Sequence, residues 1–326
     1  MAAVESDPIK DFLAGVLGGV SGVVAGQPLD TVKVRMQARP AGTYTGLLDA
    51  FQATMRKEGV AALYKGMLSP ALGCAPVNAV LFVTYGYLTR AIMEPDGALA
   101  ALLPGGGTEA ADVAERGDAN ADQQLTIGAV ALAGAGAGLA CSMITSPIDL
   151  IKIQLQNQSA KRKTAEYRGN IATIRHIVRV GGPLAIMQGL VPSFVREIPS
   201  YALYFSSYEL VKRLLLPDEL SADELSATAV ATATLLSGGI GGTLAWVSTY
   251  PIDVIKTKVQ ARDPGMVNPP SMLATARSLY AAEGHAVFFR GMSACIIRAF
   301  PANAVTFFIY ELALKLMIQD ESNEES

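Results

Sequence analysis

The amino-acid sequence predicts an all-α membrane protein in which six transmembrane helices form three repeats. Its 326 residues are 51% hydrophobic and only 17% charged, a composition too apolar for an ordinary soluble protein. The pattern Pro-x-Asp-x-x-Lys-x-x-x-Gln also occurs three times, starting at Pro28, Pro147 and Pro251. A chance match at so many positions, three times over, is very improbable, so the repeat defines the architecture.

Long runs without a charged residue mark four of the six helices, since a helix needs about 20 apolar residues to cross a bilayer. The four uncharged runs are residues 12–29, 66–89, 123–148 and 225–252. Two further stretches, residues 187–210 and 291–316, have spanning length but contain charges. Six crossings, two in each repeat, place both termini on the same side of the membrane.

A second motif follows the first and completes the repeat. Glu58-Gly59 precedes Tyr64-Lys65-Gly66 in the first copy, and Glu283-Gly284 precedes Phe289-Arg290-Gly291 in the last. Each repeat therefore reads as a helix, a basic loop with a short helix, and a second helix. The expected organisation is repeat 1 at residues 1–96, a flexible acidic loop at 97–124, repeat 2 at 125–218 and repeat 3 at 219–326.

The loops on the two sides of the membrane carry opposite charges. Loops that follow the proline motifs are rich in Lys and Arg, whereas the 97–124 loop and the C-terminal tail are rich in Asp and Glu. Basic loops mark the side that was never translocated. The net charge of −3 conceals this asymmetry, and we expect no nucleic-acid partner.

The cysteines and histidines do not indicate catalysis. Cys74, Cys141 and Cys295 lie in apolar helices without metal-like spacing, so we interpret them as core residues and expect no metal or cofactor. His176 and His285 lie in basic loops without a nucleophile or metal partner, so we do not expect the protein to be an enzyme. Residues 1–11 lack a basic amphipathic pattern, which leaves any targeting signal internal.

Glycine and proline shape the first helix of each repeat. Glycines at three- and four-residue intervals, such as Gly15, Gly18 and Gly22, let neighbouring membrane helices approach closely. The proline late in each of these helices kinks the chain. Three kinks at equal depth tilt the helix ends toward a common axis.

The charged residues after each proline suit a ring of ion pairs. Asp at Pro+2 and Lys at Pro+5 lie on one face of a helix. In a three-fold arrangement the acid of each repeat reaches the base of the next, giving the pairs Asp30–Lys152, Asp149–Lys256 and Asp253–Lys33. The alternative is ordinary interfacial charge that extends to water, but three identical pairs at one level favour the ring.

Three ionisable residues lie where the bilayer centre is expected. Arg196, Glu197 and Arg298 stand inside predicted spans, where charges are costly and usually face a water-filled path or bind a ligand. Each arginine is three residues before a proline, as is Gly73, which places all three positions at one depth. Two positive charges and one negative suit a small solute with a carboxylate and a cationic nitrogen.

Two simpler interpretations accompany this site. An Arg196–Glu197 pair would only lock helix packing, but adjacent helical residues point about 100° apart, so we do not expect these two to face each other. Trp246 lies five residues before Pro251. It either stacks on a cationic group or simply packs between helices, and both alternatives stay open.

The triple motif with its final glutamine resembles the mitochondrial carrier family over nearly the whole chain. The resemblance implies a monomeric six-helix barrel in the inner membrane, with short helices in the matrix, both termini in the intermembrane space, and two gates that open alternately. The family pattern assigns a matrix gate to Asp30, Lys33, Asp149, Lys152, Asp253 and Lys256, braced by Gln37, Gln156 and Gln260. It also assigns cardiolipin binding to the helix starts at Gly66 and Gly291.

Within this family, Arg196-Glu197-Ile198-Pro199, Arg298 and Trp246 resemble the branch that carries carnitine/acylcarnitine and basic amino acids. The implied function is exchange of amino-acid-like zwitterions between cytosol and matrix by alternating access. The implied substrate-binding residues are Arg196, Glu197, Arg298, Gly73, Asn78 and Trp246. Two alternatives remain: a fatty-acid or proton leak carrier, and a carrier of another carboxylate metabolite.

The sequence departs from the family pattern at several positions. Gln154 and Gln188 replace basic residues in the middle repeat, and Asn78 stands where basic amino-acid carriers can have an extra acid, which favours zwitterions. The outer-gate pattern of aromatic-acid-x-x-base is complete only at residues 208–212. We therefore expect a weak outer gate, with the matrix gate closed at rest. The residues of this outer gate would be Glu209, Lys212 and Glu311.

Overall fold

The computed structural model describes residues 8–40, 42–93, 99, 125–158, 169–216 and 227–324. It divides into two units. Unit 1 comprises Met1–Pro76, Thr145–Gly189 and Val254–Ser326, and unit 2 comprises Val77–Ile144 and Leu190–Asp253. The acidic loop predicted at 97–124 lies outside the described residues except for Leu99.

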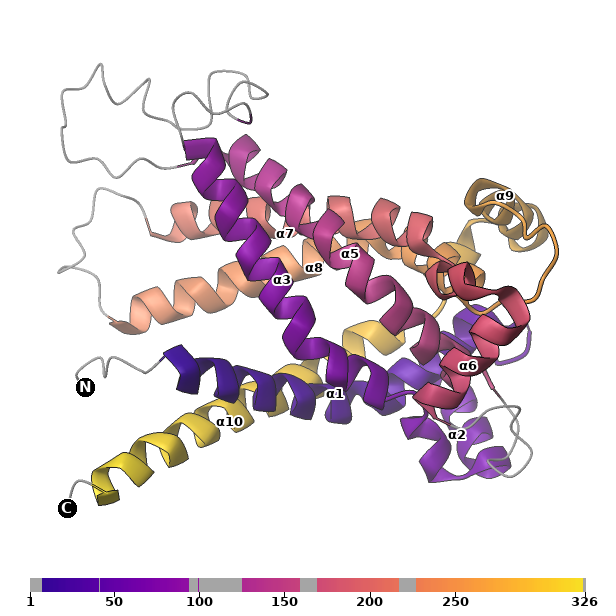
Figure 1. The fold of residues 1–326 in the computed structure, drawn as a ribbon, viewed down its shortest axis with the longest axis horizontal. Coiled ribbons are helices and arrows are strands. Elements are labelled where there is room, and N and C mark those ends of the chain that lie inside the picture. Colours follow the sequence, from indigo (N-terminus) through magenta and orange to yellow (C-terminus); the bar gives the residue numbers. More distant parts are fainter. Residues whose placement is uncertain are drawn as a thin grey trace. The chain divides into compact units, whose positions relative to one another are not determined.

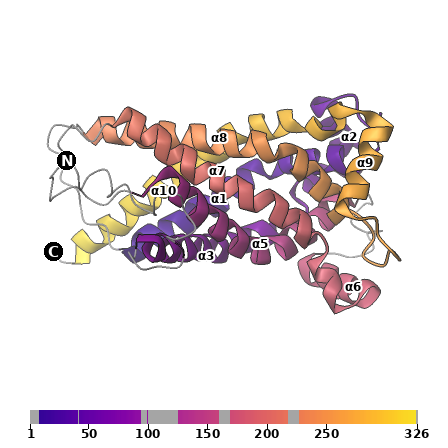
Figure 2. The same ribbon diagram turned by 90° about the horizontal axis from the view of Figure 1, so that it is seen from above.

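The described part of the chain is mostly helical, and the helices follow the order that the repeats predict. They are α1 (Pro8–Ala38), α2 (Leu47–Glu58), η1 (Val60–Tyr64), α3 (Leu68–Met93), α5 (Ile127–Asn157), α6 (Asn170–Gly181), η3 (Pro183–Met187), α7 (Leu190–Leu215), α8 (Ala227–Gln260), α9 (Met272–Glu283), η4 (His285–Phe289) and α10 (Met292–Glu324) (Figures 1 and 2). No β-strand occurs among the described residues. Each repeat consists of a long helix, a short helix with a 3₁₀ turn, and a second long helix, so the all-α class is confirmed.

Three stretches are long and apolar enough to cross a membrane. They are Val60–Met93, Ile127–Asn157 and His285–Met317. A fourth crossing results if Asn170–Gly181 and Pro183–Leu215, which are bent by 119°, count as one span. The sequence predicts six crossings, and the crossings by α1 and α8 stay predictions.

The end of α1 beyond Pro28 packs on the first short-helix segment. Thr31 donates a hydrogen bond of 2.6 Å from Oγ1 to the Leu63 carbonyl, and Gln27 donates one of 2.9 Å from Nε2 to the Lys65 carbonyl. Beneath them Val32 and Leu63 are buried with Ala50 of α2 in a small hydrophobic core. The first proline motif is therefore fixed to the rest of its own repeat.

Glycines allow close helix contacts in both units. In unit 1, α1 and α10 lie side by side and antiparallel (Figure 1): a Cβ on Gly18 would lie 2.7 Å from the Thr306 carbonyl oxygen. In unit 2, a Cβ on Gly134 of α5 would lie 2.7 Å from the Tyr201 carbonyl oxygen of α7. The predicted role of the glycine stripes is confirmed at these contacts. It is wrong for Gly15, around which a Cβ would find nothing within 4 Å.

Candidate functional site

Arg196 and Glu197 form the charged centre of unit 2. Both lie in α7, and Arg196 Nη1 donates a hydrogen bond to Glu197 Oε1. The prediction that these neighbours do not face each other is therefore wrong, because the long arginine side chain bends back over the helix surface. Arg196 Nε also lies 3.4 Å from Asp253 Oδ1 of α8. One guanidinium is thus held against two carboxylates.

Trp246 faces an internal cation. The Arg196 guanidinium carbon lies 5.3 Å from the centroid of the Trp246 ring, within the range of a cation–π interaction. The ring therefore stacks on a cation of the protein itself, and stacking on a cationic group of a solute stays a prediction. The ring fixes the orientation of Arg196 together with Glu197.

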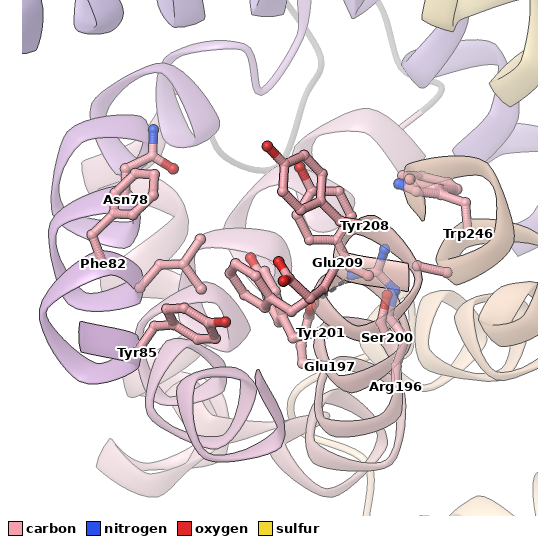
Figure 3. A pocket seen from close by; sticks show the side chains of 15 residues that line it. Asn78, Phe82, Tyr85, Arg196, Glu197, Ser200, Tyr201, Tyr208, Glu209 and Trp246 are labelled. Carbon is pink, nitrogen blue, oxygen red and sulfur yellow. Dashed lines mark hydrogen bonds and ion pairs between the residues drawn. The ribbon is translucent and has the colours of Figure 1, made fainter. Parts of the chain in front are cut away.

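These residues line a cavity of ≈ 790 Å³ within unit 2. Figure 3 shows Asn78, Phe82 and Tyr85 from α3 on one wall, facing the side chains of α7 and Trp246 of α8. Tyr85 stacks on Phe205 of α7, with ring centroids 4.0 Å apart. The volume and the apolar wall with a few polar groups are typical of small-molecule sites.

Four of the six predicted substrate-binding residues therefore share one cavity: Asn78, Arg196, Glu197 and Trp246. Three tyrosines of α7 that line this cavity were not predicted. Tyr201, Tyr204 and Tyr208 follow Glu197 at helical spacing on α7 and line the cavity. That spacing of four, seven and eleven residues is the signal that would have revealed them.

Arg298 and Gly73 belong to unit 1. Arg298 Nε lies 3.0 Å from Asp30 Oδ1, and a Cβ on Gly73 would lie 2.6 Å from Ile148 Cδ1. A site that they share with residues of unit 2 stays a prediction.

Two of the predicted ion pairs between repeats are present in unit 1. Lys152 Nζ lies 2.7 Å from Asp30 Oδ2, and Lys256 Nζ lies 2.7 Å from Asp149 Oδ2. The third pair would join Lys33 of unit 1 to Asp253 of unit 2, so it stays a prediction.

The glutamines of the motif cross-link neighbouring helices beside these ion pairs. Gln37, Gln156 and Gln260 are fully buried. Gln156 donates to Thr31 Oγ1 over 3.1 Å, directly after Asp30 on α1. Gln260 donates to the Ser146 carbonyl over 3.1 Å, directly before Pro147 on α5. Two of the glutamines therefore attach the first helix of one repeat to that of the preceding repeat.

Ion pairs attach the short helices in the first and last repeats. Arg35 Nη1 lies 2.7 Å from Glu58 Oε1, and Lys65 Nζ lies 2.6 Å from Glu58 Oε2. Burial alone would raise the pKa of Glu58, but the hydrogen bonds from Arg35 and Lys65 outweigh it and hold this pKa below its ordinary value. Arg290 and Glu283 form the corresponding pair in the last repeat.

The middle repeat replaces these charges by amides. Gln154 Nε2 donates to the carbonyls of Gln260 and Arg262, over 2.7 and 2.6 Å, and Gln188 Nε2 donates to the Val259 carbonyl over 2.9 Å. These carbonyls are at the end of α8, where backbone acceptors need donors. The two departures from the pattern are therefore satisfied by neutral hydrogen bonds.

Comparison with known proteins agrees with this architecture. The sequence profile described as "Mitochondrial carrier protein" matches residues 4–96, 123–219 and 228–321. The chain belongs to the mitochondrial carrier family. Its predicted family resemblance is confirmed, and proteins of this family are transporters of small molecules.

Three relatives match over almost their whole length. "Mitochondrial substrate carrier family protein S" of Dictyostelium discoideum is 33% identical over 312 residues, 95% of this chain and 98% of the relative. "Mitochondrial basic amino acids transporter" of Rattus norvegicus is 34% identical over 321 residues, 97% and 92% respectively. "Mitochondrial carnitine/acylcarnitine carrier protein" of Macaca fascicularis is 32% identical over 316 residues, 95% of each chain. Two of these three names specify a solute, and the two solutes differ.

One acid predicted for the outer gate of this carrier, Glu209, forms an ion pair within its own helix. Glu209 Oε1 lies 2.9 Å from Arg213 Nε, one turn along the same helix. Glu311 is exposed. Arg213, the partner of Glu209, was not among the predicted residues. The weak outer gate itself stays a prediction.

The glycines predicted to bind cardiolipin have a structural role of their own. Gly66 and Gly291 have φ of 75° and 81°, in the left-handed region that favours glycine. A Cβ on Gly66 would also lie 2.9 Å from the Lys152 carbonyl oxygen. These positions turn the chain into α3 and α10, and lipid binding there stays a prediction.

Proposed function

We propose that this carrier exchanges a small zwitterion between the cytosol and the mitochondrial matrix across the inner membrane. The solutes that fit are amino acids, including basic ones, and carnitine or acylcarnitine. The observation that supports this most strongly is the unit 2 cavity, in which Arg196 and Glu197 meet a wall of aromatic rings.

The charges of the cavity favour the cationic end of such a solute. The charged residues that line the cavity are Arg196, Glu197 and Glu209, one positive and two negative. Glu197 is 5% exposed, and a carboxylate this buried favours a counter-charge. Tyrosine and tryptophan rings add faces on which an ammonium or guanidinium group can stack. Glu197 would therefore bind the cationic nitrogen.

The carboxylate of the solute would bind Arg298. This part of the proposal rests on the position of Arg298, three residues before Pro301 as Arg196 is before Pro199. Gly73 holds the corresponding position in repeat 1, where it lies against Ile148 and adds no charge. No covalent step is involved.

Transport would proceed by alternating access of a monomer. The ion pairs of Asp30 and Asp149 close the matrix side, and a solute that interacts more strongly with one gate state shifts the balance between states. The termini would lie in the intermembrane space, and cardiolipin would bind at the helix starts after Gly66 and Gly291.

Uptake into cardiolipin-containing liposomes tests the proposal. Purified carrier would be reconstituted with matching solute inside, and uptake of labelled L-arginine, L-ornithine, a neutral amino acid, L-carnitine and an acylcarnitine would be measured. Saturable uptake of at least one, lost in Glu197→Gln and in Arg298→Ala, is expected. Uptake of none of them by the wild-type carrier would refute the proposal, and uptake that persists in Glu197→Gln would point to a leak.

A further inference from the structure

One aspartate of unit 1 is shared by two cations. Asp30 Oδ2 lies 2.7 Å from Lys152 Nζ, and Asp30 Oδ1 lies 3.0 Å from Arg298 Nε. Lys152 is the base of the ring, whereas Arg298 is a predicted substrate-binding residue of α10. The carboxylate therefore uses one oxygen for the gate and the other for the arginine.

The same relationship recurs in unit 2. Arg196 Nε lies 3.4 Å from Asp253 Oδ1. Both arginines stand three residues before the proline of a second long helix, and both aspartates stand two residues after the proline of the next repeat's first long helix. Two independent copies of one contact indicate a built arrangement.

In repeat 1 a glycine stands in place of the arginine. Gly73 occupies the corresponding position on α3, and a Cβ there would lie 2.6 Å from Ile148 Cδ1, directly before Asp149. The side chain of Asp149 pairs with Lys256 and is 31% exposed, against 17% for Asp30. The position faces the same segment in all three repeats, but only an arginine shields the aspartate.

The contact between Arg298 Nε and Asp30 is an ion pair without an aligned hydrogen bond. Although the atoms are 3.0 Å apart, the Nε–H of Arg298 is not aligned on Asp30 for a hydrogen bond. Bidentate, aligned hydrogen bonds are the strongest way for a guanidinium to bind a carboxylate. An incoming carboxylate that achieves this geometry is a better partner for Arg298 than Asp30.

We propose that Asp30 is the resting counter-ion of Arg298, and that the substrate carboxylate must displace Asp30 from Arg298 in order to bind. Asp253 and Arg196 repeat this relationship. Displacement therefore removes one of the two ion pairs that the structure gives Asp30, with Lys152 and with Arg298. This inference rests on the proposed function, because it requires a substrate with a carboxylate.

A double-mutant cycle without any solute tests the resting ion pair. Melting temperatures of the full carrier in detergent would be measured for Asp30→Asn, Arg298→Gln and the double variant. We expect the double variant to lose at least about 2 °C less than the sum of the single losses. The cycle of Asp149→Asn with Arg298→Gln should be additive. Additivity in the first cycle would overturn the shared-aspartate assignment.

Affinity for a carboxylate solute tests the displacement. L-arginine and L-carnitine would be titrated, and binding read from the rise in melting temperature, which requires no turnover. Asp30→Asn and Lys152→Gln break the same gate bond, but only Asp30→Asn frees Arg298. We expect Asp30→Asn to tighten binding at least about threefold and Lys152→Gln to leave it unchanged or weaker.

Asp149→Asn and Lys256→Gln provide the matched control. Position 73 has no arginine, so these two variants should change affinity alike. Equal changes in Asp30→Asn and Lys152→Gln would overturn the displacement. If the wild-type carrier binds neither solute, the proposed function and the displacement are both refuted, while the double-mutant cycle still decides whether Asp30 and Arg298 pair.

Discussion

Arg35 and Glu58 form a buried two-point ion pair that attaches the end of α1 to the end of α2. Arg35 Nη1 lies 2.7 Å from Glu58 Oε1 and Nη2 lies 3.0 Å from Oε2, and the two side chains are 1% and 4% exposed. Arg35 Nε also donates to the Gln156 carbonyl of α5 over 3.1 Å. One guanidinium therefore connects repeat 1 to repeat 2.

Glu58→Gln should destabilise the carrier strongly. It leaves the buried Arg35 guanidinium without its carboxylate, and removing one partner of a buried pair costs about 3 kcal/mol. The loss would appear as a lower melting temperature in detergent. The double variant Arg35→Gln/Glu58→Gln should recover part of it. A melting temperature of Glu58→Gln equal to that of the wild type would contradict the role of this pair.

The stability that Glu58 contributes should be lost in acid. Its hydrogen bonds hold its folded pKa below the ordinary 4.5, so the contribution is fully present above pH 4.5 and disappears as the pH falls through the folded pKa. The difference in melting temperature between wild type and Glu58→Gln should be constant at neutral pH and shrink below pH 4.5. A difference that grows in acid would show that the shift has the opposite sign.

Gly18→Ala should separate α1 from α10. The new Cβ would lie 2.7 Å from the Thr306 carbonyl oxygen, a backbone atom that cannot turn away. Overpacking of this kind costs about 1–3 kcal/mol. Gly15→Ala, three residues earlier on α1, meets nothing within 4 Å and is the control. If both variants melt at the same temperature, close packing at Gly18 is not what limits stability.

Gln154→Glu should be more damaging than Gln154→Ala. The buried amide donates to the carbonyls of Gln260 and Arg262, and a carboxylate of the same shape would face both oxygens with no hydrogen to donate. We expect a loss of about 2 kcal/mol for the alanine and a larger loss for the glutamate. Thermal unfolding of both variants distinguishes this hydrogen-bond role of Gln154 from a simple packing role. If Gln154 only fills space, the glutamate variant would be more stable than the alanine variant.

The sequence predicts the helix order and the Asp30–Lys152 and Asp149–Lys256 pairs because these depend on a pattern that repeats three times. The sequence does not predict the contacts of long side chains that have several possible partners within reach. The rule that helical neighbours diverge describes Cβ directions, and it misses an arginine that bends from Arg196 to Glu197. For the same reason the stacking of Arg196 on Trp246 and the pairing of Glu209 with Arg213 were not predicted.

The direct test of the central claim, that the unit 2 cavity holds the solute, is uptake by a variant that fills the cavity. Gly242 of α8 lines it, and a Cβ there meets only Tyr204 at an ordinary distance of 3.8 Å. Gly239 lies on the same helix, exposed and with nothing within 4 Å, and is the control.

Uptake of labelled L-arginine and L-carnitine would be measured for Gly242→Leu and Gly239→Leu, at matched melting temperatures. We predict that Gly242→Leu lowers uptake of the transported solute at least about tenfold, while Gly239→Leu transports like the wild type. Wild-type uptake by Gly242→Leu would contradict the claim that the solute occupies this cavity.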